Sequence, residues 1–313
     1  MDTSGTGPED GLRAGVIGLG MIGGGVATSL HRSGRTPVVY DVRPEAATRL
    51  PGAPMVAASP ADLGARADVV LIAVVSAQQA REVITGDSGI LTSAHPGMTA
   101  VVLSTLELPV IRELAAACAE RGVGFLDCGV TPGDKAAQNG LVTMVGGDEA
   151  TLSRARPVLD DFAREVVHCG PTGAGMATKL ARNIITYGSW RAVAEAAALA
   201  GAAGVDPRTL TEVIAAADPE GSTLLSLLQM RSFTEDEASA FLSRGSAAGS
   251  ATPQGAEAIA AVQKMVAGIL PLMDKDLAAA EDAASELGLD LPLVAAARSR
   301  TEQTLGIHEE LEA

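Results

Sequence analysis

Aromatic side chains and cysteines are scarce in this sequence. The 313-residue chain has only 2% aromatic residues, four histidines and three cysteines. So few cysteines, with no zinc-ligand spacing, show neither a disulfide framework nor a metal site, and they indicate a reducing compartment. Apolar residues still make up 47% of the chain. Ala, Val, Leu and Ile must therefore fill a sizeable core.

Positive charge is also in short supply. The 23 Lys and Arg residues face 38 Asp and Glu residues, which gives a formal net charge of −15. This balance argues against nucleic acid and anionic membrane surfaces as partners. The longest apolar run, residues 69–75, is too short to cross a bilayer, and the acidic, polar start of the chain does not resemble a signal peptide. We therefore expect a cytoplasmic protein.

The first half of the chain alternates between strand and helix patterns. Short apolar runs of this kind are typical of strands buried on both faces of a sheet. The strand patterns lie at residues 15–18, 36–40, 69–75, 100–103, 124–126 and 141–145, and the helical patterns at 22–33, 44–50 and 109–121. This alternation predicts a parallel α/β sheet.

After residue 170 the patterns are helical throughout. Residues 176–203 are Ala-rich and predict one long helix that ends at Gly204. Shorter helices are expected at residues 207–217, 221–230, 235–243, 257–270, 275–287 and 293–305. The segment 243–255, rich in Ser, Ala and Gly, fits either a mobile loop or a lid. We predict an α/β domain over residues 12–172 and an all-helical domain over residues 173–313.

A glycine-rich turn follows the first predicted strand and opens the first predicted helix. It matches the pattern G-x-G-x-x-G, whose glycines permit a tight turn, close approach to a pyrophosphate, and close packing of helix on strand. The helix N-terminus offers N–H groups and a positive dipole end to phosphates. The context favours a dinucleotide-binding domain of the Rossmann type over a purely structural turn. The candidate cofactor residues are Gly18, Leu19, Gly20, Met21, Ile22 and Gly23.

An acidic residue, Asp41, ends the second predicted strand, 23 positions after Gly18. A carboxylate there can accept hydrogen bonds from the ribose hydroxyls and repel a 2′-phosphate, which favours NAD over NADP. Arg43 weakens this preference because arginine can bind that phosphate, and an ordinary loop aspartate is the other interpretation. Further candidate cofactor residues at the strand ends are Val42, Val74, Val75 and Ser76.

Lys179, Asn183, Tyr187 and Trp190 recur at helical spacing and form one stripe on the predicted long helix. A partly buried lysine can relay a proton to or from a carbinol, because burial lowers its pKa. An amide one turn away can orient the lysine or the substrate. Taken alone, however, such a stripe is more often a solvated face with its aromatic rings packed on a neighbour.

Four motifs, in order, resemble the β-hydroxyacid dehydrogenase family, which includes 3-hydroxyisobutyrate dehydrogenase, tartronate semialdehyde reductase and 6-phosphogluconate dehydrogenase. The motifs are the glycine turn, Ser104-Thr105 with Pro109, the run Asp-Cys-Gly-Val-Thr-Pro-Gly at residues 127–133, and Gly173-x-Gly175-x-x-x-Lys179-x-x-x-Asn183. A later Lys275-Asp276 is similar to the family's K-D pair. The resemblance covers about residues 14–305.

The resemblance implies a Rossmann domain, a long interdomain helix, and a helical domain that often dimerises. It makes Lys179 the general acid/base and lets Asn183 hold the substrate oxygen or the lysine. Thr131 and the Gly133 backbone would bind the substrate carboxylate, and we include the neighbouring Pro132 and Tyr187 in the substrate site. Thr105 would lie close to the nicotinamide, and Lys275 would reach the cofactor.

Two positions depart from the family's patterns. Pro132 stands where the family's substrate loop, matched here by residues 127–133, has Gly, and proline removes a backbone donor. Thr186 stands where 6-phosphogluconate dehydrogenases carry a glutamate, which argues against decarboxylation of 6-phosphogluconate. Imine reductases share the fold but lack the lysine, so Lys179 argues against that activity.

The leading hypothesis is an NAD-dependent dehydrogenase of a small β-hydroxyacid such as 3-hydroxyisobutyrate, working as a homodimer or higher homo-oligomer. One alternative is a reductase of an aldehyde acid or phosphorylated sugar acid, and another is a non-catalytic dinucleotide-binding module. Residues 218–255 match no substrate signature. Within them Arg231, which lies close to Phe233, is either a carboxylate ligand or a solvated helix end. Cys128 is interpreted as a small buried residue. His168 is not taken as catalytic, because no acidic residue stands at a suitable spacing from it.

Overall fold

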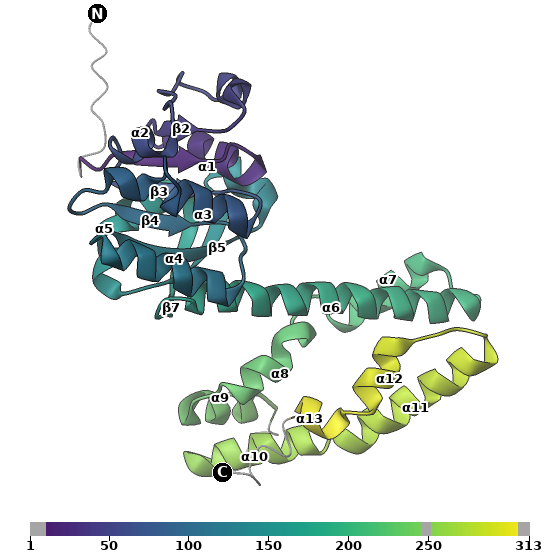
Figure 1. Ribbon diagram of the computed structural model, residues 1–313. Helices are drawn as coiled ribbons and strands as arrows, with labels where there is room; N and C mark the ends of the chain where they lie inside the picture. Colours follow the sequence, from purple (N-terminus) through teal and green to yellow (C-terminus); the bar gives the residue numbers. More distant parts are fainter. Residues whose placement is uncertain (1–10, 246–251, 306–313) are drawn as a thin grey trace, which may run out of the picture. The chain divides into compact units, whose positions relative to one another are not determined.

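The computed structural model describes residues 11–245 and 252–305 (Figure 1). Its contacts divide the chain into two compact units, the first up to Ile185 and the second from Thr186. The boundary falls within the longest helix, α6 (Ala174–Ala202). The acidic, polar start of the chain, residues 1–10, and about half of the Ser/Ala/Gly-rich segment 243–255 lie outside the described residues.

A seven-stranded sheet forms the centre of the first unit (Figure 1). The strands are β1 (Ala14–Ile17), β2 (Val38–Tyr40), β3 (Val69–Ile72), β4 (Thr99–Val102), β5 (Gly124–Thr131), β6 (Leu141–Gly146) and β7 (Ala163–Gly170). Their order in the sheet is β2-β1-β3-β4-β5-β6-β7. The predicted α/β sheet of the Rossmann type is therefore confirmed.

The sheet is parallel, as predicted, except at one point, where β5 and β6 pair antiparallel. The connection between these strands, residues 132–140, is shorter than the dozen or so residues that a parallel crossover needs. The chain must therefore turn straight back along β5.

Short helices connect the strands of the first unit. They are α1 (Met21–Arg32), the 3-10 helix η1 (Pro44–Arg49), α2 (Pro60–Gly64), α3 (Ala77–Thr85), the 3-10 helix η2 (Ile90–Ser93), α4 (Leu108–Glu120), the 3-10 helix η3 (Gly133–Gln138) and α5 (Glu149–Asp160). Sequence patterns missed α2, α3 and α5, and also β7. The missed strand is mostly exposed, with Val166 its single buried residue, so it carries no apolar alternation.

The apolar core of the first unit lies on both faces of the sheet. Successive residues of β3 alternate between two buried clusters: Leu71 belongs to one, and Val70 and Ile72 belong to the other. Cys118 and Cys128 are buried in these clusters, while Cys169 is partly exposed. Burial raises the pKa of Cys118 to about 12 and also raises that of Cys128. These thiols serve as small core residues, as predicted for Cys128.

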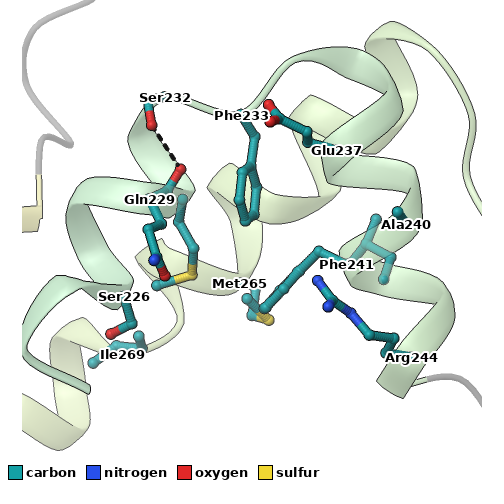
Figure 2. A pocket seen from close by; sticks show the side chains of 12 residues that line it. Ser226, Gln229, Ser232, Phe233, Glu237, Ala240, Phe241, Arg244, Met265 and Ile269 are labelled. Atoms are coloured by element: carbon teal, nitrogen blue, oxygen red, sulfur yellow. Dashed lines mark hydrogen bonds between the residues drawn. The ribbon is translucent and has the colours of Figure 1, made fainter. Parts of the chain in front are cut away.

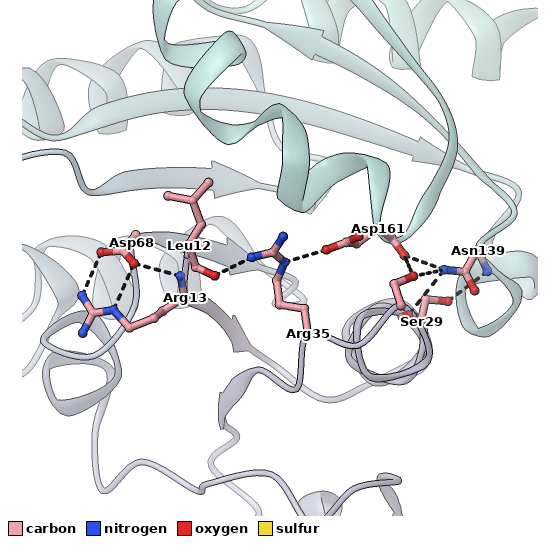
Figure 3. Close-up of polar contacts among 8 residues, drawn as sticks. Leu12, Arg13, Ser29, Arg35, Asp68, Asn139 and Asp161 are labelled. Carbon is pink, nitrogen blue, oxygen red and sulfur yellow. Dashed lines mark hydrogen bonds and ion pairs between the residues drawn. The ribbon is translucent and has the colours of Figure 1, made fainter. Parts of the chain in front are cut away.

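Helix α1 is held against η3 by the buried Ser29 hydroxyl, whose contact with Asn139 Figure 3 shows, and by a close backbone approach. The Ser29 hydroxyl donates to the Ala136 carbonyl at 2.7 Å and accepts from the Asn139 N–H at 2.9 Å. A Cβ on Gly25 would lie only 2.6 Å from the Ala136 Cβ. The segment that follows the predicted substrate loop is therefore held against the predicted dinucleotide helix.

Ion pairs brace the amino-terminal edge of the sheet, next to these contacts (Figure 3). The Arg13 guanidinium binds Asp68 at 2.8 Å, which joins the starts of β1 and β3. Arg35, almost fully buried, pairs with Asp161 at 2.6 Å at the end of α5. These pairs lie away from the carboxyl ends of the strands, where ligands of α/β sheets bind.

The second unit is helical throughout its described residues, as predicted. After α6 come α7 (Pro207–Ala217), α8 (Thr223–Arg231), α9 (Glu235–Gly245), α10 (Ala256–Ala267), α11 (Leu270–Glu286), α12 (Pro292–Arg298) and α13 (Thr301–Leu305). The helix expected at 293–305 is thus broken in two. The buried carboxylate of Glu195 on α6 accepts from the N–H groups of Leu293 and Val294 and so caps α12.

Many large apolar side chains of the second unit are exposed. Examples are Trp190 (65%), Leu224 (58%), Leu228 (58%) and Leu272 (57%). By length and composition alone, the stretch Ala256–Glu286 is apolar enough to cross a membrane, with only 17% of its most apolar window buried. Charged residues such as Glu257, Lys264 and Asp274 interrupt this stretch, so it contains no long unbroken apolar run. Length and composition are weak evidence for a membrane helix, and the stretch marks a surface that this unit does not cover itself.

Candidate functional site

A cavity of about 680 Å³ opens at the carboxyl ends of β1, β2 and β3. The predicted cofactor residues that line it are Gly18, Gly20, Asp41, Val42, Arg43, Val74 and Val75. This is the crevice where open α/β sheets bind nucleotides. Sequence reasoning missed the opposite wall, which includes Ser59, Gln79, Glu82 and Ser88, because these residues come from α2, α3 and loops that it did not predict.

The glycines of the turn have separate physical roles. Gly18 has φ +85°, and a Cβ there would lie 2.4 Å from the Ala73 carbonyl. A Cβ on Gly23 would lie 1.8 Å from the Gly18 carbonyl, so only glycine lets α1 pack on the turn. Gly20 has no atom within 4 Å of its missing side chain, and it begins α1 without a side-chain cap. Open space beside free N–H groups at a helix start fits a phosphate.

Asp41 is built into this turn. One carboxylate oxygen accepts from the Leu19 N–H at 2.7 Å, and the other accepts from the Arg43 N–H at 2.9 Å. Burial alone would raise the pKa of Asp41, but these hydrogen bonds and the Arg43 charge hold it below its ordinary value. The carboxylate is therefore ionised at neutral pH. The Arg43 guanidinium forms an ion pair with the same carboxylate, with 3.3 Å between Nε and Oδ1.

The other predicted cofactor residues of this unit lie around the cavity without lining it. Met21 and Leu19 border a smaller hollow of about 340 Å³, which shares Gly20 and Arg43 with the cavity. The Ser76 hydroxyl caps α3 by accepting from the Gln79 N–H, which is a structural role that the sequence did not indicate. Thr105 is exposed just after β4.

The predicted substrate loop meets the start of α1. Thr131 ends β5, Pro132 follows, and Gly133 begins η3. A Cβ on Gly133 would lie 3.1 Å from the tips of the Met21 and Ile22 side chains. The loop thus lies against the first residues of the dinucleotide helix, where a substrate would sit beside the reactive end of a cofactor.

Lys179 projects from α6 onto β5. Its ammonium donates to the Val130 carbonyl at 2.7 Å, one residue before Thr131. A Cβ on Gly129 would lie 2.5 Å from the Lys179 Cβ, so glycine in the strand admits the lysine stem. Burial, and secondarily the charge of Arg182, lower the pKa of Lys179. A lysine with a lowered pKa beside a binding loop is suited to proton transfer.

Asn183 lies one helical turn after Lys179 and is partly buried. Its side-chain oxygen accepts from the Arg182 guanidinium at 3.3 Å. Sequence reasoning did not single out Arg182, although the spacing i, i+3 from Lys179 puts both cations on neighbouring faces of the helix. The structure thus places Lys179 beside the predicted substrate loop, with Asn183 one turn further along the same helix.

Tyr187 and Lys275 belong to the second unit. The Tyr187 ring packs edge-on against Trp190 of the same helix, with 5.2 Å between centroids, and both residues are exposed, unlike the packing on a neighbour that the stripe suggested. Lys275 is exposed and lies 3.2 Å from the carboxylate of Asp276. The substrate role of Tyr187 and the cofactor role of Lys275 stay predictions.

A second large cavity, of about 1200 Å³, lies within the second unit between α8, α9 and α10 (Figure 2). Phe233 and Phe241 line it, with 5.4 Å between their ring centroids. Arg231 ends α8 and is exposed. This cavity accounts for part of the segment 218–255, whose sequence carried no recognisable signature.

Comparisons with known proteins agree with this arrangement. Residues 13–170 match the profile of the NAD-binding domain of 6-phosphogluconate dehydrogenase, and residues 173–241 match that of the NAD-binding region of NADP-dependent 3-hydroxyisobutyrate dehydrogenase. The chain belongs to the β-hydroxyacid dehydrogenase family. It therefore binds a nicotinamide cofactor and shares its family with dehydrogenases that act on small molecules.

Individual relatives agree with this assignment. The mitochondrial 3-hydroxyisobutyrate dehydrogenase of Mus musculus is 34% identical over 64% of this chain, and the match spans 60% of the mouse enzyme. An uncharacterised oxidoreductase of Mycobacterium tuberculosis is 38% identical over 66% of this chain and 70% of its own length. The matched region is thus about two thirds of the chain or less.

Solved structures extend the likeness over nearly the whole chain. A Mycobacterium tuberculosis 3-hydroxyisobutyrate dehydrogenase, solved with L-serine, is 28% identical with a TM-score of 0.62, covering 95% of this chain and 94% of that one. An imine reductase from Myxococcus stipitatus reaches a TM-score of 0.73 at 16% identity, covering 95% and 94% of the two chains. The second likeness shows the shared fold alone.

The geometry around Lys179 predicts how activity depends on pH. If neutral Lys179 accepts the hydroxyl proton, kcat/KM for alcohol oxidation rises with pH through an apparent pKa below the ordinary lysine value. Arg182→Gln removes a nearby positive charge that disfavours the Lys179 ammonium. The pKa of Lys179 therefore rises, and the rise of kcat/KM moves to higher pH. Arg112→Gln, which removes an exposed arginine with no such influence, leaves the profile in place. If kcat/KM of Arg182→Gln rises at the same pH as that of the wild type, the electrostatic coupling between Arg182 and Lys179 is contradicted.

Proposed function

We propose that this chain is an NAD-dependent dehydrogenase of a small β-hydroxyacid of the 3-hydroxyisobutyrate type. The observation that carries the proposal is the Lys179 ammonium, whose pKa is lowered and which lies 2.7 Å from the Val130 carbonyl beside Thr131. The nucleotide cavity and the loop residue Gly133 belong to the same unit. Hydride transfer requires this neighbourhood of a cofactor, an acid-binding loop and a proton relay.

NAD fits the cavity better than NADP. Asp41 is held in place by Leu19 and Arg43 and is ionised, so it offers an acceptor for ribose hydroxyls and repels a 2′-phosphate. Arg43, which is paired with Asp41, is the residue that would favour NADP. Gly20 and the uncapped start of α1 would hold the pyrophosphate.

Bound nicotinamide supplies a carbon that takes a hydride from the substrate carbinol or returns it. Lys179 in its neutral form accepts the hydroxyl proton as the carbinol C–H bond breaks and the carbonyl forms. Asn183 donates an amide N–H that steadies the substrate oxygen or the lysine. Thr131 and the Gly133 N–H hold the substrate carboxylate. Pro132 restricts the backbone of the loop and has no N–H to donate to the carboxylate. In the reverse direction, protonated Lys179 returns the proton to the alkoxide.

Two alternative activities differ from the main proposal in the direction of hydride transfer or in the size of the substrate. A reductase of an aldehyde acid would use the same residues in reverse. The likeness of residues 13–170 to a 6-phosphogluconate dehydrogenase domain justifies testing a phosphorylated sugar acid as well. The sparse and partly buried cysteines support a cytoplasmic location.

Turnover is tested by following NADH at 340 nm with 3-hydroxyisobutyrate, serine, tartronate semialdehyde and 6-phosphogluconate, in both directions where the substrate allows. We expect turnover of a small β-hydroxyacid with NAD. Lys179→Met should lower kcat by about 10²–10⁴-fold while the Kd for NAD stays within twofold, because the lysine is outside the nucleotide cavity. Lys264→Met, an exposed lysine of α10, is the matched control. Wild-type kcat in Lys179→Met would rule out the proposed mechanism.

The cofactor preference is tested at Asp41. Asp41→Ser removes the charge that repels a 2′-phosphate, so the ratio of kcat/KM for NAD to that for NADP should fall by roughly tenfold. Asp41→Asn keeps an acceptor for the ribose but removes the charge, so it separates repulsion from hydrogen bonding. A wild-type enzyme that prefers NADP would contradict this interpretation of Asp41.

We also propose that the second unit associates with a second copy of the chain. The exposed apolar residues of α8 and the poorly buried stretch Ala256–Glu286 need a partner surface, and a large exposed apolar area is typical of an interface. An identical chain offers the same apolar surface and so forms a closed pair.

Sedimentation velocity should therefore give about twice the chain mass of 31.6 kDa, or a multiple of that dimer. Leu224→Glu combined with Leu228→Glu should shift the protein toward the monomer, because it puts charge into the contact. Met55→Glu, an exposed apolar residue of the first unit, should leave the mass unchanged. A wild-type monomer at micromolar concentration, or one recovered only with detergent, would overturn the homodimer.

A further inference from the structure

We infer that Asp127 is a positioning residue for catalysis: its buried carboxylate fixes the first turn of α6 on β5 and thereby sets where Lys179 stands. This inference rests on the proposed role of Lys179. Asp127 does not line the nucleotide cavity, and although it is the first residue of the run 127–133, nothing in that motif separates its role from that of its neighbours.

Both oxygens of Asp127 are taken up by the start of α6. Oδ1 accepts from the Gly173 N–H at 2.6 Å, and Oδ2 accepts from the Met176 N–H at 2.7 Å. The Asp127 residue is fully buried. No lysine or arginine of the described residues forms an ion pair with it, so its partners are backbone N–H groups at a positive helix end. Short hydrogen bonds to a buried carboxylate are strong and directional.

Glycines bring strand and helix close enough for this capping. A Cβ on Gly175 would lie 2.4 Å from the Met144 carbonyl and 2.5 Å from that of Asp127. A Cβ on Gly146 would lie 2.5 Å from Oδ1 of Asp127. The first turn of α6 is thus in direct backbone contact with β5 and β6, and the carboxylate locks it there. A shift of the helix would break these contacts together.

The same strand holds the lysine at its other end. The Asp127 carboxylate accepts from the Met176 N–H of α6. Three residues further along α6 and along β5, the Lys179 ammonium donates to the Val130 carbonyl. Helix and strand are therefore joined at two points, one on each side of Gly129, where the lysine stem crosses. Releasing the first point lets the helix start drift, and the ammonium then no longer has a fixed direction. Displacements of about 1 Å at a catalytic group are enough to cost large factors in rate.

Asp127→Asn tests the inference with almost no change in shape. The amide can accept from one N–H, but its NH₂ group faces the other, so one hydrogen bond becomes a repulsion. We expect kcat per folded protein to fall at least tenfold, with the Kd for NAD within twofold of wild type. The primary isotope effect on kcat, measured with 3-hydroxyisobutyrate deuterated at the carbinol carbon, should rise because chemistry becomes the slower step.

Asp148→Asn is the matched control. Asp148 caps α5 by accepting from the Thr151 N–H at 2.9 Å, and α5 carries no residue of the proposed site. This variant should lose stability but keep kcat and the isotope effect. If Asp127→Asn keeps wild-type kcat and isotope effect per folded molecule, Asp127 has a structural role only and the inference is wrong.

Hydrogen exchange on the wild-type protein supplies a test that needs no variant. The Gly173 and Met176 amides should be protected to the level of the β5 amides, since they are buried on a carboxylate. Exchange as fast as that of an ordinary frayed helix start would overturn the inference, even if Asp127→Asn does not fold. Lys179→Met distinguishes the two proposals. If this variant still turns over substrate at the wild-type rate, the proposed role of Lys179 is wrong, and the positioning role of Asp127 falls with it. Loss of turnover there, with unchanged kcat in Asp127→Asn, removes only the positioning role.

Discussion

Direct contact between backbones, with no side chain between them, is the constraint on which the site depends. It occurs where α1 leaves the first turn, at Gly18 and Gly23, and again where α6 meets β5 and β6, at Gly175, while Gly129 leaves room for the Lys179 stem. A single methyl group at any of these positions would approach another atom more closely than van der Waals contact allows. The phosphate-binding helix start and the lysine-bearing helix are therefore both placed by missing side chains, and the polar groups then fix details that this contact makes possible.

The charged groups of the site are held by hydrogen bonds that also stabilise the fold. Asp41 joins the glycine turn to the end of β2, and Lys179 joins α6 to β5. Each group thereby has its direction set before any ligand arrives, which lowers the reorganisation needed during reaction. Asp41 shows the cost of this arrangement: its carboxylate already accepts three hydrogen bonds from Leu19 and Arg43, so its capacity for a ribose is limited to the remaining lone pairs.

The sequence predicted those parts of the fold that depend on local pattern. Buried runs such as that of β3, and the Ala-rich α6, were found because their periodicity or composition is strong. The antiparallel turn into β6 could not be found, since it follows from the length of a connection rather than from any residue type. The exposed β7 has no apolar alternation. At the site, motif order identified Lys179 and the glycine turn, whereas Gln79 lies on α3, which the sequence did not reveal, and Arg182 belongs to no motif on the predicted helix.

The distribution of the three cysteines makes thiol chemistry on this chain selective. Cys118 and Cys128 are enclosed in the two core clusters, and burial raises the pKa of both thiols, so they react as thiolates only when the fold opens. Cys169 is partly exposed near the end of β7, four residues before the glycine at which Asp127 binds the start of α6. A maleimide dye or spin label added to the native protein would therefore attach at one place. The natural sequence already provides a single-site reporter beside the helix that carries the proposed proton relay.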